Sequence, residues 1–194
     1  MEHYFTNNED LEHNIKKINI SINGINYFYY TDNGVFSKDN LDTGSKILLE
    51  TFEDNKNIKK ILDIGCGCGP IGIYLCKKNY DVDMCDINNR ALILAKRALD
   101  EQGLKANVLN SDAYCNIKSK YDCIISNPPI RVGKSKLYEI VIDAKEHLNE
   151  NGFILIVIRK DKGAKSLLKD LEKKYSKANV INIKKGYYII KAIV

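Results

Sequence analysis

The chain has 194 residues, of which 44% are hydrophobic, and its formal net charge is +5. That length and apolar content can fill one domain but would be cramped as two, so we expect a single domain over residues 1–194. No apolar run approaches the roughly 20 residues that span a bilayer. The polar, acidic stretch Met1 to Asp10 is unlike a signal peptide, so we expect a soluble, cytoplasmic protein without a membrane partner. The mildly basic charge favours an anionic partner.

Cysteine usage argues against a disulfide framework. None of the six cysteines forms a C-x-x-C pair, and most lie within or beside expected strands and helices. We interpret them as small buried hydrophobic side chains in a reduced compartment, and we expect no metal. The short spacing of Cys66 and Cys68 leaves a zinc site open as the alternative.

Residues 1–33 are predicted to form an extension that carries a β-hairpin. Isoleucines alternate with polar residues from Ile18 to Ile22, which is the period of a strand. Asn23 and Gly24 follow as a hairpin turn, and Ile25 to Thr31 is the expected return strand.

A helix is expected next, within residues 34–52. Asp42 or Thr43 is placed to cap it, and its apolar face includes Ile47 to Leu49. The plainest interpretation is a helix that covers a sheet, with Phe36 as its hydrophobic anchor. Phe36, however, follows Gly34-Val35 in a loop and does not lie on a periodic face.

Strands and helices then alternate to the end of the chain. This alternation predicts a parallel sheet with helices on both faces. The last two strands are joined by residues 184–186 alone, too few for a crossover, so they are expected to pair antiparallel. The expected strands are 59–64, 81–86, 106–110, 121–126, 152–158, 179–183 and 187–193, and the expected helices are 70–78, 89–102, 135–148 and 163–175.

The stretch ILDIGCGCGPIG is predicted to be a ligand-binding turn between a strand and a helix. Asp63 ends the strand, and Gly65, Gly67 and Gly69 precede a helix that begins near Pro70. Glycines let the backbone turn sharply and let a ligand approach it closely. The dinucleotide fingerprint needs glycine where Pro70 stands, and a Walker loop needs Gly-Lys-Ser/Thr at the helix start. A carboxylate before the glycines instead suits a cationic ligand without phosphate, such as S-adenosylmethionine.

Further carboxylates follow the next two strands. Asp86 ends its strand and can accept both ribose hydroxyls of an adenosine moiety, with Ile87 against the adenine. Asp112 can accept the adenine amino group while Ala113 offers its backbone N–H. With Asp63, these carboxylates would meet at one sheet edge. The alternatives are that Asp86 only caps a helix and that Asp112 is solvated.

The segment SNPPIRVGK is the candidate catalytic loop. Pro128 and Pro129 stiffen the loop and remove two N–H donors, so that it presents carbonyl oxygens. Oδ1 of Asn127 and the Pro128 carbonyl can accept the two hydrogens of an exocyclic amine and aim its lone pair at a sulfonium methyl, without a strong base. Ile130 can make apolar contact with a base. The alternative is an ordinary Asn-Pro-Pro turn.

These motifs resemble a known family. ILDIGCGCGPIG and SNPPI resemble class I N-methyltransferases that modify amino groups of bases or of glutamine. GVFSKDNLDTGS, NPPIR and KGYYIIKA are similar to segments of RsmC-type small-subunit rRNA (guanine-N2)-methyltransferases, in a short single-domain form. The resemblance implies a Rossmann-like α/β class I fold, with a mostly parallel seven-stranded sheet, an antiparallel last strand and residues 34–194 as the catalytic core.

The resemblance also implies an activity and its site residues. It implies S-adenosylmethionine as methyl donor, S-adenosylhomocysteine as product, and RNA as partner, either rRNA or the small ribosomal subunit, rather than DNA. The catalytic set is Asn127, Pro128, Pro129 and Ile130, and the cofactor set is Phe36, Asp42, Asp63, Gly65, Cys66, Gly67, Gly69, Asp86, Ile87, Asp112, Ala113 and Asn127. Many relatives carry an aromatic residue where Ile130 stands. Arg131 and Lys134 are expected to grip phosphates, within a basic rim that continues through Lys136, Arg159, Lys160, Lys162 and Lys165.

Two other functions are compatible with the same residues. A protein glutamine or a small-molecule amine could take the place of guanine, and activity would then not require RNA. A module that binds S-adenosylmethionine and RNA and supports ribosome assembly without turnover is the second alternative. Its RNA affinity would not respond to substitution of Asn127.

Overall fold

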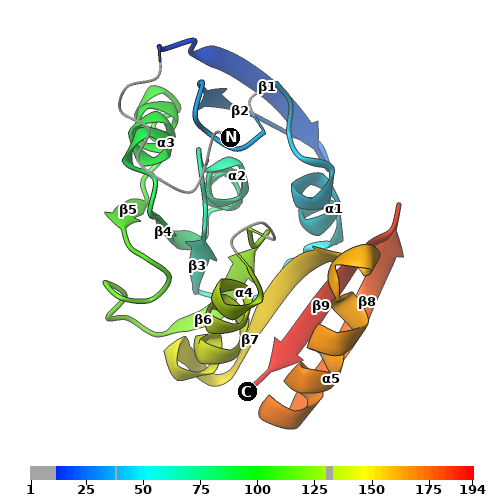
Figure 1. Cartoon of the computed structure of the whole chain (residues 1–194). Helices are drawn as coiled ribbons and strands as arrows, with labels where there is room; N and C mark the ends of the chain where they lie inside the picture. Colours follow the sequence, from blue (N-terminus) through cyan, green and yellow to red (C-terminus); the bar gives the residue numbers. More distant parts are fainter. Residues whose placement is uncertain (1–11, 38, 130–132) are drawn as a thin grey trace.

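A computed structural model describes residues 12–37, 39–129 and 133–194, which are organised around a seven-stranded sheet (Figure 1). Its strands are β3 (Lys60–Ile64), β4 (Asp81–Asp86), β5 (Asn107–Asn110), β6 (Tyr121–Ser126), β7 (Leu148–Arg159), β8 (Lys177–Lys184) and β9 (Tyr187–Ile193). The strand order is β5-β4-β3-β6-β7-β9-β8. Pairing is parallel from β5 to β7, and β9 is antiparallel to both β7 and β8. The predicted mostly parallel sheet with antiparallel C-terminal strands is confirmed.

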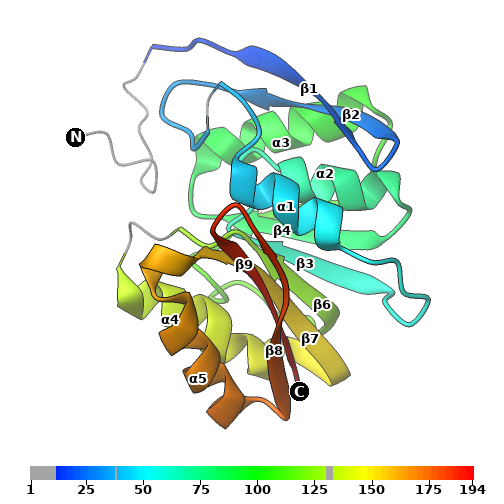
Figure 2. The same cartoon turned by 90° about the vertical axis from the view of Figure 1, so that its right-hand side faces the viewer.

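Helices cover both faces of the sheet (Figure 2). One face carries α1 (Thr43–Thr51), α2 (Pro70–Lys77) and α3 (Asn89–Glu101), and the other carries α4 (Lys134–Ile142) and α5 (Ala164–Lys174). Side chains alternate along each strand, because successive residues point to opposite faces. Ile61 of β3 therefore belongs to the core under α1, α2 and α3, whereas the next residue, Leu62, belongs to the core under α4 and α5.

The predicted N-terminal hairpin is confirmed and lies outside the main sheet. β1 (Lys16–Ile22) pairs antiparallel with β2 (Ile25–Thr31), and Asn23 and Gly24 both have positive φ at the turn. The hairpin packs over α2 and α3 (Figure 1). The Gln102 side chain binds both backbone groups of Phe28, accepting from its N–H at 3.2 Å and donating to its carbonyl at 2.9 Å. This side chain satisfies the edge of β2 and attaches the hairpin to the end of α3.

One predicted helix and the strand after it have different bounds in the structure. The helix expected at 135–148 ends at Ile142 and continues as the 3₁₀ turn η2 (Asp143–His147), and β7 begins at Leu148 instead of 152. The polar residues before Gly152 resemble a loop in sequence but form a β-bulge. Tyr121 pairs with Leu148, whereas Cys123 pairs with Phe153. The other predicted bounds differ by at most two residues.

Three further features bear on the class of protein. Within residues 12–37, 39–129 and 133–194, no helix is long and apolar enough to cross a membrane. Five of the six cysteines are free and buried, and Cys115 is free and exposed. Within the same ranges, no three His, Cys, Asp or Glu side chains gather in a group that could hold a metal ion.

Candidate active site

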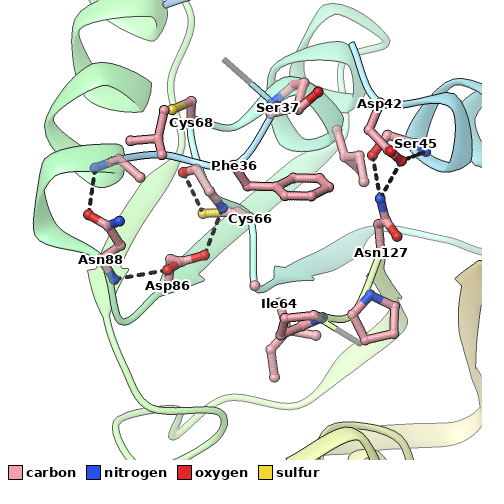
Figure 3. A pocket seen from close by; sticks show the side chains of 18 of the residues that line it. Phe36, Ser37, Asp42, Ser45, Ile64, Cys66, Cys68, Asp86, Asn88 and Asn127 are labelled. Atoms are coloured by element: carbon pink, nitrogen blue, oxygen red, sulfur yellow. Dashed lines mark hydrogen bonds between the residues drawn. The ribbon is translucent and has the colours of Figure 1, made fainter. Parts of the chain in front are cut away.

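A cavity of about 980 Å³ opens at the carboxyl ends of β3, β4 and β6. β3 is flanked by β4 on one side and β6 on the other, so the chain order reverses here, and such a switch point is where open α/β sheets bind ligands. The walls come from the loop that leads into α1, from the glycine turn after β3, and from the Asn-Pro-Pro segment after β6 (Figure 3).

The glycine turn exposes backbone to the cavity. Gly65 and Gly67 have φ of 69° and 54°, a region that side chains disfavour. The amides of Gly65 and Cys66 both donate to the Cys85 carbonyl, at 2.9 and 3.0 Å, which attaches the turn to the end of β4. A Cβ built on Gly67 would meet no protein atom within 4 Å. The turn therefore leaves room for a ligand to approach the backbone, as predicted.

Two residues expected to contact the cofactor do not line the cavity. A Cβ on Gly69 would come within 2.4 Å of Met84 Cε and 3.1 Å of Ala95 Cβ, so this glycine allows close packing of the turn against the core. Asp63 is fully buried, and its Oδ2 accepts the Gly72 N–H at 2.8 Å. Burial raises the pKa of Asp63 to about 7. We therefore revise the interpretation of both residues, from cofactor contacts to supports of the turn.

Asp86 lines the cavity and also holds the turn. Its carboxylate accepts the Gly67 N–H at 2.8 Å and the Asn88 N–H at 2.9 Å, and burial raises its pKa. Asn88, which the sequence interpretation did not include, is 3% exposed and caps α3. Its side-chain amide donates to the Gly34 carbonyl at 3.1 Å, so it connects the loop before α1 to the end of β4. The sequence indicates this role of Asn88 through its position immediately before a helix, where asparagine is favoured as a cap.

The three residues predicted to contact the adenine, Ile87, Asp112 and Ala113, all line the cavity. Ile87 is 39% exposed, and Asp112 and Ala113 share its wall of the cavity. Asp112 Oδ1 pairs with Lys136 Nζ at 2.7 Å, and Lys136 also pairs with Glu139 at 2.8 Å. The Asp112 side chain is half exposed, so solvent screens this ion pair.

The Asn127 side chain is oriented by the start of α1. Its Nδ2 donates to Asp42 Oδ2 at 2.8 Å and to Ser45 Oγ at 2.9 Å (Figure 3). The carboxylate can only accept, so the nitrogen of the amide faces α1 and Oδ1 takes no part in these contacts. Asp42 is confirmed as the helix cap, because it accepts the Ser45 N–H at 3.1 Å. Ser45 was not among the predicted site residues, since only the fold brings it to Asn127.

Phe36 is not the hydrophobic anchor of the helix α1 that follows it. Val35 is buried with 1% exposure, whereas Phe36 is 53% exposed. Figure 3 shows the Phe36 ring in the cavity, between the Cys66 turn and Asn127. An aromatic ring left half exposed beside a cavity is available to contact a ligand.

Part of the expected basic rim lies at the cavity. Lys136, Arg159 and Lys162 line it, but Lys134, at the start of α4, does not. Lys134 is exposed and its Nζ lies 5.0 Å from the Tyr138 ring centroid. The predicted residues Ile130 and Arg131 lie outside the described residues.

Comparison with known proteins identifies the family. Residues 26–191 match the family model of the methyltransferase small domain, which covers most of the chain. The chain belongs to the methyltransferase small domain family. It is an S-adenosylmethionine-dependent methyltransferase of the RsmC type.

Similar proteins extend this assignment. The uncharacterized protein YbxB of Bacillus subtilis is 36% identical over 196 residues, which is 98% of each chain. Ribosomal RNA small subunit methyltransferase C of Haemophilus influenzae is 43% identical over 138 residues, which cover 68% of this chain and 42% of the relative. The present chain thus spans less than half of that relative's length.

A solved structure shares the fold. The 16S rRNA N2 methyltransferase RsmC of T. thermophilus, in complex with AdoMet and guanosine, superimposes with a TM-score of 0.82 at 23% identity. The match covers 92% of this chain and 50% of that chain. It confirms the class I methyltransferase fold predicted from the sequence.

Proposed function

We propose that this methyltransferase methylates the exocyclic N2 amine of a guanine in small-subunit ribosomal RNA. The observation that carries the proposal is the oriented Asn127 amide. Both hydrogens of its nitrogen are directed to Asp42 and Ser45, so Oδ1 is left to accept from an amine. The Haemophilus influenzae relative, a ribosomal RNA small subunit methyltransferase, favours RNA as the substrate, and the structural neighbour in complex with guanosine favours guanine as the acceptor.

The cavity residues fit S-adenosylmethionine. Gly65 and Gly67 would seat its methionine portion against open backbone, and Asp86 would accept from the ribose hydroxyls. Ile87 and Phe36 would supply apolar contact. The turn carries no lysine for a phosphate, which suits a ligand with a positive charge. When bound, S-adenosylmethionine supplies an electrophilic methyl group on a sulfonium.

Asn127 and the Pro128 carbonyl would prepare the amine for attack. An amine on a base is a poor nucleophile because its lone pair is delocalised into the ring. Two hydrogen bonds, to Asn127 Oδ1 and to the Pro128 carbonyl, would hold the nitrogen and favour its pyramidal form. The nitrogen lone pair then forms the new N–C bond, the C–S electrons return to sulfur, and the nitrogen loses one proton to solvent. No strong base is needed.

The charge distribution is compatible with an RNA partner. Arg159, at the end of β7, and Lys162, just beyond it, both line the cavity, and the chain carries a net charge of +5. Cations at this position could bind the phosphates that flank a target nucleotide.

Methyl transfer to ribosomal RNA tests the proposal directly. Labelled S-adenosylmethionine is supplied with unmodified small ribosomal subunits or with naked rRNA, and the nucleosides are analysed by mass spectrometry. We expect N2-methylguanosine, and its appearance in one sample or both identifies the form recognised. If the protein binds S-adenosylmethionine but no nucleoside gains a methyl group, the RNA proposal fails. Protein glutamine and small amines are then the acceptors to assay.

Substitution of Asn127 tests the site. In Asn127→Ala we expect kcat to fall by roughly 10²–10³, the loss seen when one preorganised hydrogen-bonding group is removed from an active site. Affinity for S-adenosylmethionine, measured by calorimetry, should stay near the wild-type value. The matched control is Asn57→Ala, which removes an exposed asparagine from the loop before β3. Undiminished turnover in Asn127→Ala would exclude catalysis by orientation of the amine.

A further inference from the structure

We infer that Asp42 and Ser45 are positioning residues that lock the Asn127 amide in its productive orientation, and that the Asp42 carboxylate also stabilises positive charge on the attacking amine. The inference rests on the proposed function, because it assigns Asn127 Oδ1 to the amine. It gives the D-x-G-S pattern at the start of α1 a role in positioning Asn127, beside the cofactor contact predicted for Asp42.

The Asn127 amide has a hydrogen-bond acceptor for each of its two N–H groups. Nδ2 of Asn127 has two hydrogens, and it has two acceptors at 2.8 and 2.9 Å, Asp42 Oδ2 and Ser45 Oγ. If the amide turned by 180°, its Oδ1 would face a carboxylate oxygen, and two acceptors in contact repel each other. The carboxylate therefore selects one of the two amide orientations. The selected orientation leaves Oδ1 for the substrate.

Asp42 and Ser45, which orient the amide, are themselves held in place by the start of α1. Asp42 Oδ2 caps α1 by accepting the Ser45 N–H at 3.1 Å, and the same oxygen accepts from Asn127 Nδ2. Ser45 is 5% exposed. Between them, a Cβ on Gly44 would lie 2.9 Å from Asp42 Oδ2 and 3.1 Å from the Tyr187 ring, so a larger residue here would displace the Asp42 carboxylate or the ring. Aspartate, glycine and serine thus each have a separate physical task in one turn.

The negative charge of Asp42 has a separate effect from its position. As the amine attacks, its nitrogen becomes positive until it loses a proton to solvent. A carboxylate hydrogen-bonded to the far side of the Asn127 amide polarises that amide and makes Oδ1 a stronger acceptor. Asp42 Oδ2 lies 2.8 Å from Asn127 Nδ2, so in this proposal only the Asn127 amide separates the negative charge from the charged nitrogen, whose energy the carboxylate would lower. Ser45 contributes orientation alone, whereas Asp42 contributes orientation and charge.

Three variants separate these contributions. Asp42→Asn keeps an acceptor oxygen for both Ser45 N–H and Asn127 but removes the charge. Ser45→Ala keeps the charge and the cap but removes one acceptor. Asp42→Ser keeps a side chain favoured at helix N-caps but removes the carboxylate that accepts from Asn127. The matched controls are Asp39→Asn, an exposed carboxylate of the same loop, and Thr43→Ala, an exposed hydroxyl in the same turn.

Steady-state kinetics provide the first readout. We expect kcat to fall about tenfold in Asp42→Asn and in Ser45→Ala, and about a hundredfold in Asp42→Ser, as for other losses of preorganised polar groups. KM for the methyl acceptor and Kd for S-adenosylmethionine should change little, and both controls should match wild type. Equal kcat in all three variants and wild type would overturn the inference. A parallel loss of kcat and of cofactor affinity would indicate a merely structural role and would overturn it as well.

The second readout does not depend on the acceptor. The side-chain amide resonance of Asn127, assigned by its loss in Asn127→Ala, should show slow hydrogen exchange in the wild-type protein. Exchange should accelerate in Ser45→Ala and Asp42→Ser and stay slow in Asp42→Asn. Fast exchange in the wild-type protein would overturn the lock. If no acceptor is methylated, the proposed function fails, whereas the amide resonance still decides the lock.

Discussion

Asp63 shows how one side chain can belong to a binding motif without contacting the ligand. It ends β3 immediately before the glycine turn, yet its carboxylate faces the core and accepts the N–H of Gly72 inside α2. Oδ1 is buried without a hydrogen-bond partner in the described structure. Burial raises the pKa of Asp63 to about 7 from its ordinary value of 3.8, although the Gly72 hydrogen bond opposes this shift. The proton is therefore held more tightly in the folded state than in the unfolded chain.

This raised pKa predicts a pH-dependent stability. The contribution of Asp63 to the free energy of unfolding is fully present below about pH 4 and is lost as pH rises through about 7. The free energy of unfolding would change by about 4 kcal/mol at most. In Asp63→Asn this decline should disappear, so that the variant gains stability over wild type between pH 5 and about pH 8. Urea unfolding at several pH values measures it, with Asp81→Asn, exposed at the start of β4, as control. The same pH slope in wild type and Asp63→Asn would contradict the assignment.

At the scale of elements, β7 contains a bulge near its start and ends at the cavity. β7 runs from Leu148 to Arg159, and its register against β6 shifts between Leu148 and Phe153. Asn149 Nδ2 donates to Asp122 Oδ1 at 2.7 Å, which holds the bulge to β6. The strand then continues far enough to bring Arg159 to the cavity.

Gly152 is the residue on which the bulge depends. A Cβ there would lie 2.8 Å from the Asn149 carbonyl oxygen and 3.1 Å from that of Tyr121, both backbone atoms that cannot move away easily. Gly152→Ala is therefore expected to lower the free energy of unfolding by about 1–3 kcal/mol, the usual cost of overpacking. Thermal or urea denaturation measures the loss. Asn151→Gly, at the adjacent position with φ of 61°, should be neutral or slightly stabilising; an equal loss there would point to general intolerance of the segment.

At the scale of the whole molecule, the fold brings cations from several elements to one cavity while other lysines remain on solvated faces. Lys162 lines the cavity, whereas Lys169 is exposed on α5 and does not line it. If RNA phosphates bind at the cavity, only the first of these lysines releases counterions on binding.

The salt dependence of RNA binding tests this distribution. Lys162→Ala should reduce the slope of log K against log salt by about 0.7 to 1, the expected loss of one phosphate contact. Lys169→Ala should leave the slope as in wild type. Fluorescence anisotropy with a labelled rRNA fragment, at several salt concentrations, measures both. Equal slopes in wild type and Lys162→Ala would remove this lysine from the proposed RNA contact.

The sequence by itself determined the elements and the identity of the turns. Strand and helix periods, the Asn23-Gly24 turn, a helix cap at Asp42 or Thr43 and the glycine turn after β3 are local properties of the backbone, so neighbouring residues encode them. The glycine turn and the Asn-Pro-Pro loop were sufficient to indicate an S-adenosylmethionine-dependent methyltransferase, which the family match confirms.

Only the tertiary structure decided which way the site side chains face. The contact between Asp42 and Asn127 joins residues 85 positions apart, and no local pattern encodes it. Burial of Asp63, exposure of Phe36 and the bulge before Gly152 likewise depend on which distant surface packs against each residue. Backbone preference is a local property, but the surroundings of a side chain are produced by the whole fold.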